Sequence, residues 1–230
     1  MKSALLFDLD GTLVDTDALH FAAFRNAFAP FGVALDLDQY RRQIMGAPNS
    51  AIGEAFLSHL PVAQREEIIA GKEHAFRQSF QTARPMTGLT ALLDFAEESG
   101  VGLAVVTNAP RANAELMLAT LGLAQRLPCV VIGAELPRSK PDPLPYATAL
   151  QLTGADAVCS IAFEDSLSGI RSAAAAGLAV VGLTTGLDAA ALVSAGAAFG
   201  VADFTDPRID NLVAERIGAR PRRDDAGRLA

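Results

Sequence analysis

The sequence feature that most constrains the fold is the stretch at residues 5–16, LLFDLDGTLVDT. Apolar residues at 4–7 lead directly into Asp8 and Asp10, and Gly11 follows. A short apolar run closed by a turn signal is typical of a buried strand. Side chains two positions apart on an extended chain point the same way, so both carboxylates face one place beyond the strand end. Because they repel each other and lose hydration there, they stay ionised only beside a positive partner.

Composition limits the function classes that this chain can serve. Of its 230 residues, 50% are hydrophobic and 20% are charged, which allows a sizeable core in one large domain or in a core with an insert. The net charge of −7 argues against nucleic acid or an anionic membrane as the main partner. Two cysteines beside apolar runs, Cys129 and Cys159, indicate buried free thiols in a reducing compartment. No apolar run has the length of a signal sequence or a membrane span, so we expect a cytoplasmic protein.

The chain divides into a helical stretch and an alternating stretch. Residues 3–8 read as the first strand. From residue 16 to residue 84, only helical periodicity is visible, and phenylalanines at 21, 24, 28 and 31 lie on one helix face. Beyond residue 85, strands are expected at 101–106, 129–132, 158–163 and 178–183, and helices at 88–98, 112–121, 143–152 and 167–176. Strands that alternate with helices of this length predict an α/β fold with a parallel sheet.

Polar side chains follow the predicted strands where each strand ends. Thr107 and Asn108 close the second strand, Glu164 and Asp165 close the fourth, and Lys140 lies in the loop after the third. Ligands of open parallel sheets bind outside the carboxyl ends of the strands. Acids, a lysine and a hydroxyl that gather at this edge with the acids of the first strand indicate a functional site.

These motifs resemble those of the haloacid dehalogenase-like superfamily, most of whose members are Mg²⁺-dependent phosphatases. Four motifs agree in order: DLDGT at 8–12, Thr107-Asn108, Lys140-Pro141 and FEDS at 163–166. The nearest branch is that of sugar phosphatases and β-phosphoglucomutases, whose helical cap is inserted after the first motif. The resemblance therefore implies a Rossmann-like core at 1–15 and 85–216 and an all-helical cap at 16–84. An Arg-rich segment at 217–230 is expected to be a flexible tail.

The resemblance also implies roles for the acids. Asp8 is expected to attack phosphorus and form an aspartyl-phosphate. Asp10 is expected to protonate the leaving oxygen and then to activate water. Mg²⁺ is expected on Asp8, the backbone carbonyl of Asp10 and Asp165, with Glu164 bound directly or held behind the ligands.

Four further residues are expected to bind substrate. Thr107 and Lys140 match the positions that contact the transferring phosphoryl group, and Asn108 lies beside them. Thr107 can also cap the helix that follows it. His20 matches a histidine that positions substrate in the mutase branch, and a half-buried or surface helix histidine is an equal alternative.

The cap residues depart from the mutase pattern. That pattern has an arginine for the distal phosphate of a bisphosphate, and this chain has Asn49 in the string Met-Gly-Ala-Pro-Asn-Ser at 45–50. A neutral amide does not replace a bidentate cation. Lys72 roughly matches a cap lysine of the branch, but a solvated helix charge is the preferred interpretation.

The sequence thus predicts a Mg²⁺-dependent phosphomonoester hydrolase that acts on a small sugar or polyol phosphate. A β-phosphoglucomutase-like isomerase is the alternative. Dehalogenation is disfavoured by Asp10 and by the Glu164-Asp165 pair, and a catalytically inactive regulator by the completeness of the motifs. The expected partner is a small phosphorylated metabolite, and the expected state is a monomer or a weak homodimer.

Overall fold

A six-stranded parallel sheet forms the centre of the larger part of the molecule, in a computed structural model that describes residues 1–219 and 221. The strand order is β3-β2-β1-β4-β5-β6. The strands are β1 (Ala4–Phe7), β2 (Gly102–Thr107), β3 (Val130–Ile132), β4 (Ile161–Glu164), β5 (Ala179–Leu183) and β6 (Phe199–Val201). The strand that carries the first motif, β1, therefore lies between β2 and β4, and its carboxyl end has a neighbour on each side.

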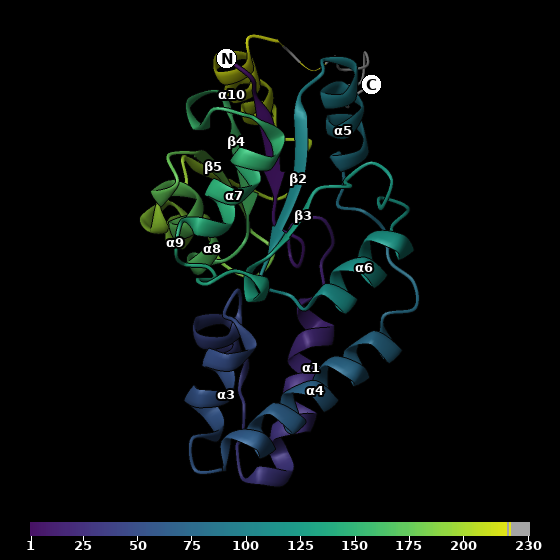
Figure 1. Ribbon diagram of the computed structural model, residues 1–230, viewed down its shortest axis with the longest axis vertical. Coiled ribbons are helices and arrows are strands. Elements are labelled where there is room, and N and C mark those ends of the chain that lie inside the picture. The colour runs from purple at the N-terminus through teal and green to yellow at the C-terminus, as the bar shows by residue number, and fades with distance from the viewer. Residues whose placement is uncertain (220, 222–230) are drawn as a thin grey trace.

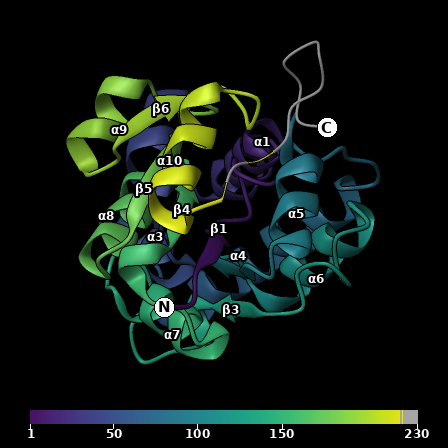
Figure 2. The same cartoon turned by 90° about the horizontal axis from the view of Figure 1, so that it is seen from above.

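Helices cover both faces of the sheet, as the view from above shows (Figure 2). They are α5 (Leu89–Glu98), α6 (Arg111–Thr120), α7 (Leu144–Thr153), α8 (Leu167–Ala175), α9 (Ala189–Ala195) and α10 (Pro207–Ile217). Alternate side chains of β1 enter opposite cores: Phe7 packs in the cluster that contains residues of α5, α6 and α10, and Leu6 in the cluster of α7, α8 and α9. The apolar run of β1 is buried on both sides, as expected of a central parallel strand.

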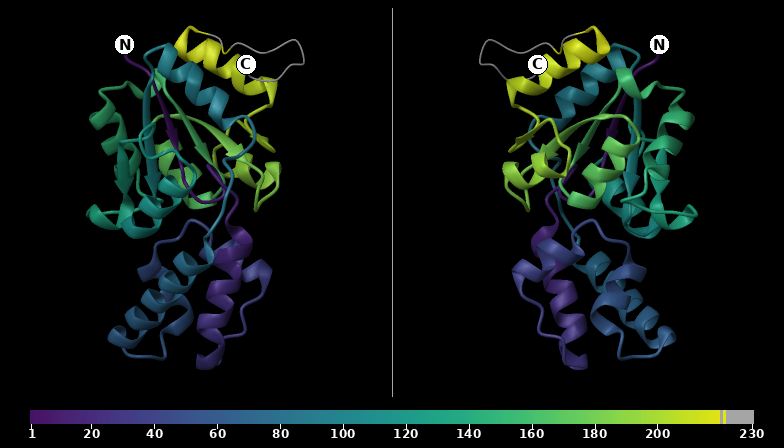
Figure 3. Two further views of the ribbon diagram at one scale, coloured as in Figure 1. Left: turned by 90° about the vertical axis from the view of Figure 1, so that its right-hand side faces the viewer. Right: turned by 90° about the vertical axis from the view of Figure 1, so that its left-hand side faces the viewer.

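A helical bundle, here called the helical insertion, is inserted in the chain between β1 and β2 and lies beyond the carboxyl ends of the strands (Figures 1 and 3). It contains α1 (Asp17–Phe28), the short α2 (Leu37–Gln39), α3 (Asn49–Leu57) and α4 (Val62–Ser79). It has its own apolar cluster, in which Phe24 and Phe28 are buried and Phe21 and Phe31 are half-buried. The predicted phenylalanine face of α1 is thus confirmed as part of this core.

The predicted α/β class, with a Rossmann-like parallel sheet and an inserted all-helical domain, is confirmed. Each of the five predicted strands is present within a few residues of its expected position. No prediction covered β6, α9 or α10, because a three-residue strand that includes Gly200 carries too little periodicity to be recognised. The two cysteines are free but half-buried.

Of the predicted tail at 217–230, only residues 217–219 and 221 are among the described residues, and Ile217 is the last residue of α10. The rest of that prediction lies outside the described residues. Within the described part of the chain, no helix combines the length and the apolar character needed to cross a bilayer.

Candidate active site

The carboxyl ends of three neighbouring strands bring distant parts of the sequence together. Asp8 directly follows β1, and its backbone N–H donates to the carbonyl of Phe163 in β4 at 2.9 Å. Thr107 ends β2 on the other side, and Glu164 ends β4. All of these polar side chains are buried, and so is Asp165. The convergence predicted from the strand ends is therefore present.

Three carboxylates form a buried acid cluster at this edge. Oxygens of Asp8, Glu164 and Asp165 lie within 4.8 Å of one another. Lys140 is 1% exposed, and its Nζ donates to Asp8 Oδ1 at 2.6 Å and to Glu164 Oε1 at 2.5 Å. Tyr146, which the sequence analysis did not single out, donates to Glu164 Oε1 at 2.8 Å. One ammonium thus contacts two of the three carboxylates, Asp8 and Glu164.

This imbalance of charge is visible in the pKa values. Burial raises the pKa of Asp8 well above its ordinary value; Lys140 opposes this shift, and the charge of Glu164 adds to it. Burial likewise raises the pKa of Asp165, and the neighbouring Asp8 and Glu164 add to the shift. Burial lowers the pKa of Lys140, but its contacts with Asp8 and Glu164 outweigh that effect and leave the pKa above its ordinary value. The cluster therefore lacks positive charge.

The donor set fits a hard divalent cation. Carboxylate oxygens in a compact group are the ligands that Mg²⁺ prefers. A bound cation would offset the effects of burial and of repulsion between the carboxylates, which raise the pKa values of Asp8 and Asp165. The loop after β1 lies against this group: a Cβ on Gly11 would come within 2.2 Å of Asp165 Oδ2. Since Gly11 also has a φ of +73°, a side chain at this position would be strained and would displace Asp165.

Asp10 points away from the acid cluster toward the helical insertion. Its Oδ1 accepts from the hydroxyl of Thr16 at 2.7 Å and lies 3.0 Å from Nε2 of His20. Burial raises the pKa of Asp10, but the charge of His20 and the hydrogen bonds from His20 and Thr16 outweigh burial, so the pKa lies below its ordinary value. Asp8 and Asp10 therefore occupy different environments although they are two residues apart.

His20 is held between core and insertion. Its Nδ1 lies 2.8 Å from Nζ of Lys72, and its ring stacks on Phe76 with centroids 3.9 Å apart. The structure thus brings His20 to the site through Asp10.

The interpretation of Lys72 as a solvated helix charge is wrong. Lys72 is 2% exposed, and its Nζ lies 3.8 Å from the centre of the Phe24 ring. Glu73, which the sequence analysis did not single out, is 5% exposed and accepts from Lys72 Nζ at 3.1 Å. Both side chains are buried because α4 packs along α1. Lys72 and Glu73 lie on the same face of α4 as the buried Ile69 and Phe76, and other charges of this helix are exposed, so local periodicity gave no sign of which charges are covered.

Asn108 connects the lysine loop to the helical insertion. Its Nδ2 donates to the carbonyl of Lys140 at 3.2 Å and to the carbonyl of Gly46 at 2.9 Å. Ser168 donates to the same Gly46 carbonyl at 2.7 Å. Thr107 does not cap the next helix: α6 begins at Arg111, and the Thr107 hydroxyl instead accepts from the N–H of Ala109 at 3.0 Å.

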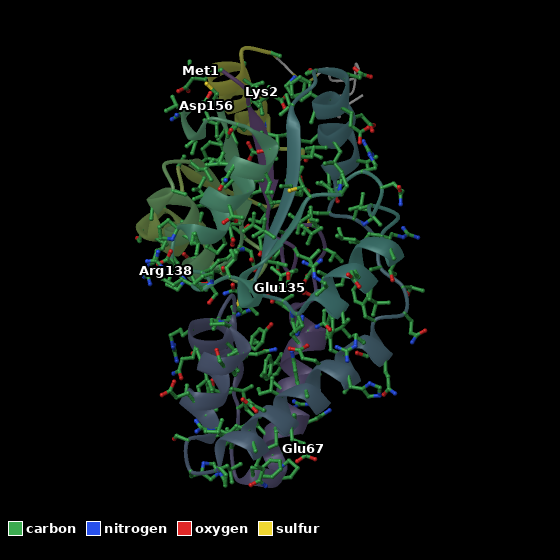
Figure 4. All side chains as sticks on the ribbon, viewed as in Figure 1. Met1, Lys2, Glu67, Glu135, Arg138 and Asp156 are labelled. Carbon is green, nitrogen blue, oxygen red and sulfur yellow. The ribbon has the colours of Figure 1, made fainter. Side chains whose placement is uncertain are left out.

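A hollow of about 80 Å³ lies between the core and the insertion. Its core wall carries Asp8, Thr107, Lys140 and Asp165, and its opposite wall carries His20, Asn49, Lys72 and Glu73. Figure 4 shows side chains from both parts meeting at this junction, level with the labelled Glu135. All of the predicted site residues except Glu164 line the hollow, and Glu164 is fully buried directly behind it.

The sequence of this chain is similar to those of known proteins. Residues 5–183 match the family model described as haloacid dehalogenase-like hydrolase. The chain is 35% identical over 196 residues to validoxylamine A 7'-phosphate phosphatase of Streptomyces hygroscopicus subsp. limoneus, with 85% of this chain and 92% of the relative covered. It is 30% identical over 198 residues to the phosphorylated carbohydrates phosphatase of Thermotoga maritima, with 84% and 91% covered.

Solved structures with a similar fold include a protein bound to a phosphorylated sugar and a phosphoglucomutase. The CbbY protein of Rhodobacter sphaeroides in complex with xylulose-(1,5)bisphosphate superposes with a TM-score of 0.75 at 27% identity, over 89% of this chain and 95% of that one. A β-phosphoglucomutase of Clostridium difficile reaches a TM-score of 0.83 at 18% identity, over 95% and 100%, and shows the shared fold. With a family match that spans the sheet from β1 to β5, the chain belongs to the haloacid dehalogenase-like hydrolase family.

Proposed function

We propose that this hydrolase is a Mg²⁺-dependent phosphatase that releases phosphate from a small phosphorylated sugar or polyol through a phosphorylated Asp8. The observation that carries the proposal is the contact of Lys140 with both Asp8 and Glu164, beside Asp165 at the strand ends. The names of the two curated relatives support a phosphorylated carbohydrate as the substrate class.

The first half of the reaction is transfer of the phosphoryl group to Asp8. A bond forms between a carboxylate oxygen of Asp8 and phosphorus as the bond from phosphorus to the leaving oxygen breaks. Thr107 and Lys140 lie on the same wall of the hollow as Asp8 and supply a hydroxyl and a positive charge to the phosphoryl oxygens. Lys140 is held for this task by Glu164 and by the carbonyl of Val106 at 2.6 Å.

The metal would be held by Asp8, Asp165 and the backbone carbonyl of Asp10. Glu164 is the less available carboxylate, since Lys140, Tyr146 and Ser166 already donate to its oxygens. When bound, Mg²⁺ supplies the positive charge that the acid cluster lacks and that a transferring phosphoryl group requires.

Asp10 is the proton donor and acceptor in this proposal. Because its pKa lies below the ordinary value, it must first take up a proton when the substrate binds; it gives this proton to the leaving oxygen and then takes a proton from the water that hydrolyses the phosphorylated Asp8. The contacts from Thr16 and His20 fix the Asp10 carboxylate on the side of the hollow that faces the insertion, where the leaving group lies.

The helical insertion at 16–84 acts as a cap, and residues 1–15 and 85–216 act as the catalytic core. The cap excludes water during transfer and opens for product release, with hinges near 15–17 and 84–85. The carbonyl of Gly46, held by Asn108 and Ser168, is a contact of the closed arrangement.

The wall of the hollow on the insertion side does not support the mutase alternative. A bisphosphate intermediate needs a cation for its distal phosphate. Asn49 stands where the mutase pattern has arginine, and its amide donates to the carboxylate of Glu73 at 2.8 Å.

A burst experiment with p-nitrophenyl phosphate and Mg²⁺ tests the proposal. The activated nitrophenolate leaves without a proton, so Asp10→Asn should release about one equivalent per enzyme rapidly and then turn over slowly, because the phosphorylated Asp8 no longer receives an activated water. Asp8→Asn should release none. Steady turnover by folded Asp8→Asn, or a wild-type protein that is inactive with Mg²⁺ on this ester and on a panel of sugar phosphates, would overturn the proposal.

A further inference from the structure

We propose that Glu73 determines the charge of the accepted substrate: it excludes leaving groups that carry a second phosphate and favours those that present hydroxyl or ammonium donors. This inference rests on the proposed function, since it concerns the same hollow. It names the substrate class as monophosphates with a neutral or cationic remainder.

Glu73 is a fixed part of the wall opposite the acid cluster. Its Oε1 accepts from Asn49 Nδ2 at 2.8 Å and from Lys72 Nζ at 3.1 Å, and its Oε2 accepts from Asn113 Nδ2 at 2.6 Å. Asn113 is a fully buried residue of α6 in the core, so Glu73 joins the helical insertion to the core. The carboxylate is thereby oriented from three sides.

Inside the hollow, the wall on the insertion side has no spare positive charge beside Glu73. Among the described residues that line the hollow on the insertion side, Lys72 is the single lysine or arginine. Its ammonium is already engaged by Glu73 and by Nδ1 of His20. Asp17 adds a further carboxylate to the same wall. A second phosphate would meet like charge there and would have to displace the ammonium of Lys72 from Glu73.

The same carboxylate can receive a donor. A carboxylate has about four acceptor positions, and the contacts described above occupy two on Oε1 and one on Oε2. The position that remains suits a hydroxyl of a sugar or polyol, and an ammonium gains from the charge as well. Glu73 thus discriminates between substrates in two ways: it attracts hydroxyl or ammonium donors, and it repels a second phosphate.

The position of Glu73 places it along the path of the leaving group. A groove of about 680 Å³ between α3 and α4 shares Asn49 and Glu73 with the hollow. A leaving group that is larger than the hollow extends past these two residues toward the groove, where Arg65 and Arg77 lie beyond Glu73, so the exclusion concerns a second phosphate held inside the hollow beside Glu73. The part of the substrate remote from the transferring phosphoryl group is therefore the part that Glu73 meets.

Inhibition constants against p-nitrophenyl phosphate hydrolysis test this inference, with glucose 6-phosphate, glucosamine 6-phosphate and glucose 1,6-bisphosphate as competing ligands. In the wild type, the bisphosphate should bind at least about tenfold more weakly than the two monophosphates. Glu73→Gln keeps the size and can accept from one of the two amides, Asn49 or Asn113, and it should reduce that ratio by about tenfold. Asn49→Arg, which leaves Glu73 in place and adds a cation, should also improve the bisphosphate relative to the monophosphates. Glu67→Gln changes an exposed acid at the far end of the same helix (Figure 4) and should leave the ratio unchanged.

A purely structural Glu73 would weaken all three ligands equally, and an unchanged ratio in folded Glu73→Gln would overturn the inference. So would a wild type that binds the bisphosphate as tightly as the monophosphates. If neither p-nitrophenyl phosphate nor the panel of sugar phosphates is hydrolysed, the proposed function fails. The same three ligands are then compared by the shifts they cause in the thermal midpoint, which test Glu73 independently of turnover.

Discussion

The ammonium of Lys140 lies 2.6 Å from Oδ1 of Asp8, and both side chains are buried although 132 positions separate them in the sequence. Lys140 is also the cation that contacts Glu164. Its charge therefore does two things: it stabilises the fold around the acids, and it lies beside the proposed nucleophile. Removal of one partner of a buried pair leaves the other charge uncompensated.

Lys140→Ala is expected to destabilise the protein by about 3–5 kcal/mol in EDTA, since Asp8 and Glu164 then lose their shared cation. Excess Mg²⁺ should restore part of this loss, because a divalent cation supplies charge to the same acids. Urea unfolding with and without Mg²⁺ measures both effects. Lys2→Ala removes an exposed lysine and serves as the control. Equal stability of Lys140→Ala and the wild type in EDTA would contradict this account of the cluster.

Mg²⁺ itself should raise the thermal midpoint of the wild type, by the equivalent of about 2.7 kcal/mol at a concentration one hundred times its dissociation constant. Asp165→Asn should lose most of this response. In EDTA, however, the variant should be at least as stable as the wild type, because Asp165 is a buried acid whose pKa is raised by burial and by Asp8 and Glu164.

Thermal melts in EDTA and in Mg²⁺ therefore give opposite orders for the wild type and Asp165→Asn. The exposed Glu98 provides the control, and Glu98→Gln should follow the wild type in both buffers. A Mg²⁺ response that survives in Asp165→Asn would place the metal elsewhere.

Most of the core half of the site could be predicted from strand ends, and Lys140, which lies in a loop well after β3, was recognised by the Lys140-Pro141 motif. Asp8, Thr107 and Asp165 come after strands whose ends meet at one edge, so local pattern and sheet topology were sufficient. The insertion half could not be predicted in this way. Lys72 and Glu73 are buried by helix packing and by Asn113, which is 40 positions from Glu73 in the sequence. A helix that carries charges on its buried face as well as on its exposed face does not reveal which of them become enclosed.

Two glycines of the helical insertion provide a matched test of its closure on the core. Gly46 and Gly32 have similar positive φ values of +68° and +79°. A Cβ on Gly46 would come within 2.3 Å of Ser166 Oγ in the core, whereas a Cβ on Gly32 would have nothing within 4 Å. Both alanine variants therefore carry similar backbone strain, and only Gly46→Ala obstructs the approach of the insertion to the core.

Gly46→Ala should lower kcat/KM by about tenfold or more relative to Gly32→Ala, and it should raise the radius of gyration measured by small-angle X-ray scattering. The two variants should lose similar stability, of the order of 1 kcal/mol, from the left-handed backbone. If both variants keep equal kcat/KM, the contact of Gly46 with the core has no part in turnover.

The buried carboxylate of Glu73 gives stability a defined dependence on pH. Burial raises its pKa, but the charges of Lys72 and His20 and the hydrogen bonds from Asn49 and Asn113 outweigh burial, so the pKa lies below its ordinary value of 4.5. The folded protein then binds this proton less readily than the unfolded chain does. The stabilisation is fully present above about pH 5, and it is lost as the pH falls through the lowered pKa of the folded state.

The free energy of unfolding of the wild type minus that of Glu73→Gln should accordingly be positive and constant from about pH 5 to pH 7, and it should shrink below about pH 4. The comparison isolates Glu73, because Asp10 and the other acids titrate in both proteins and cancel in the difference. Urea unfolding at half-unit intervals of pH measures it. A difference that is constant down to pH 3 would show that Glu73 contributes through its shape and hydrogen bonds alone, and a difference that grows on acidification would mean that its folded pKa is raised.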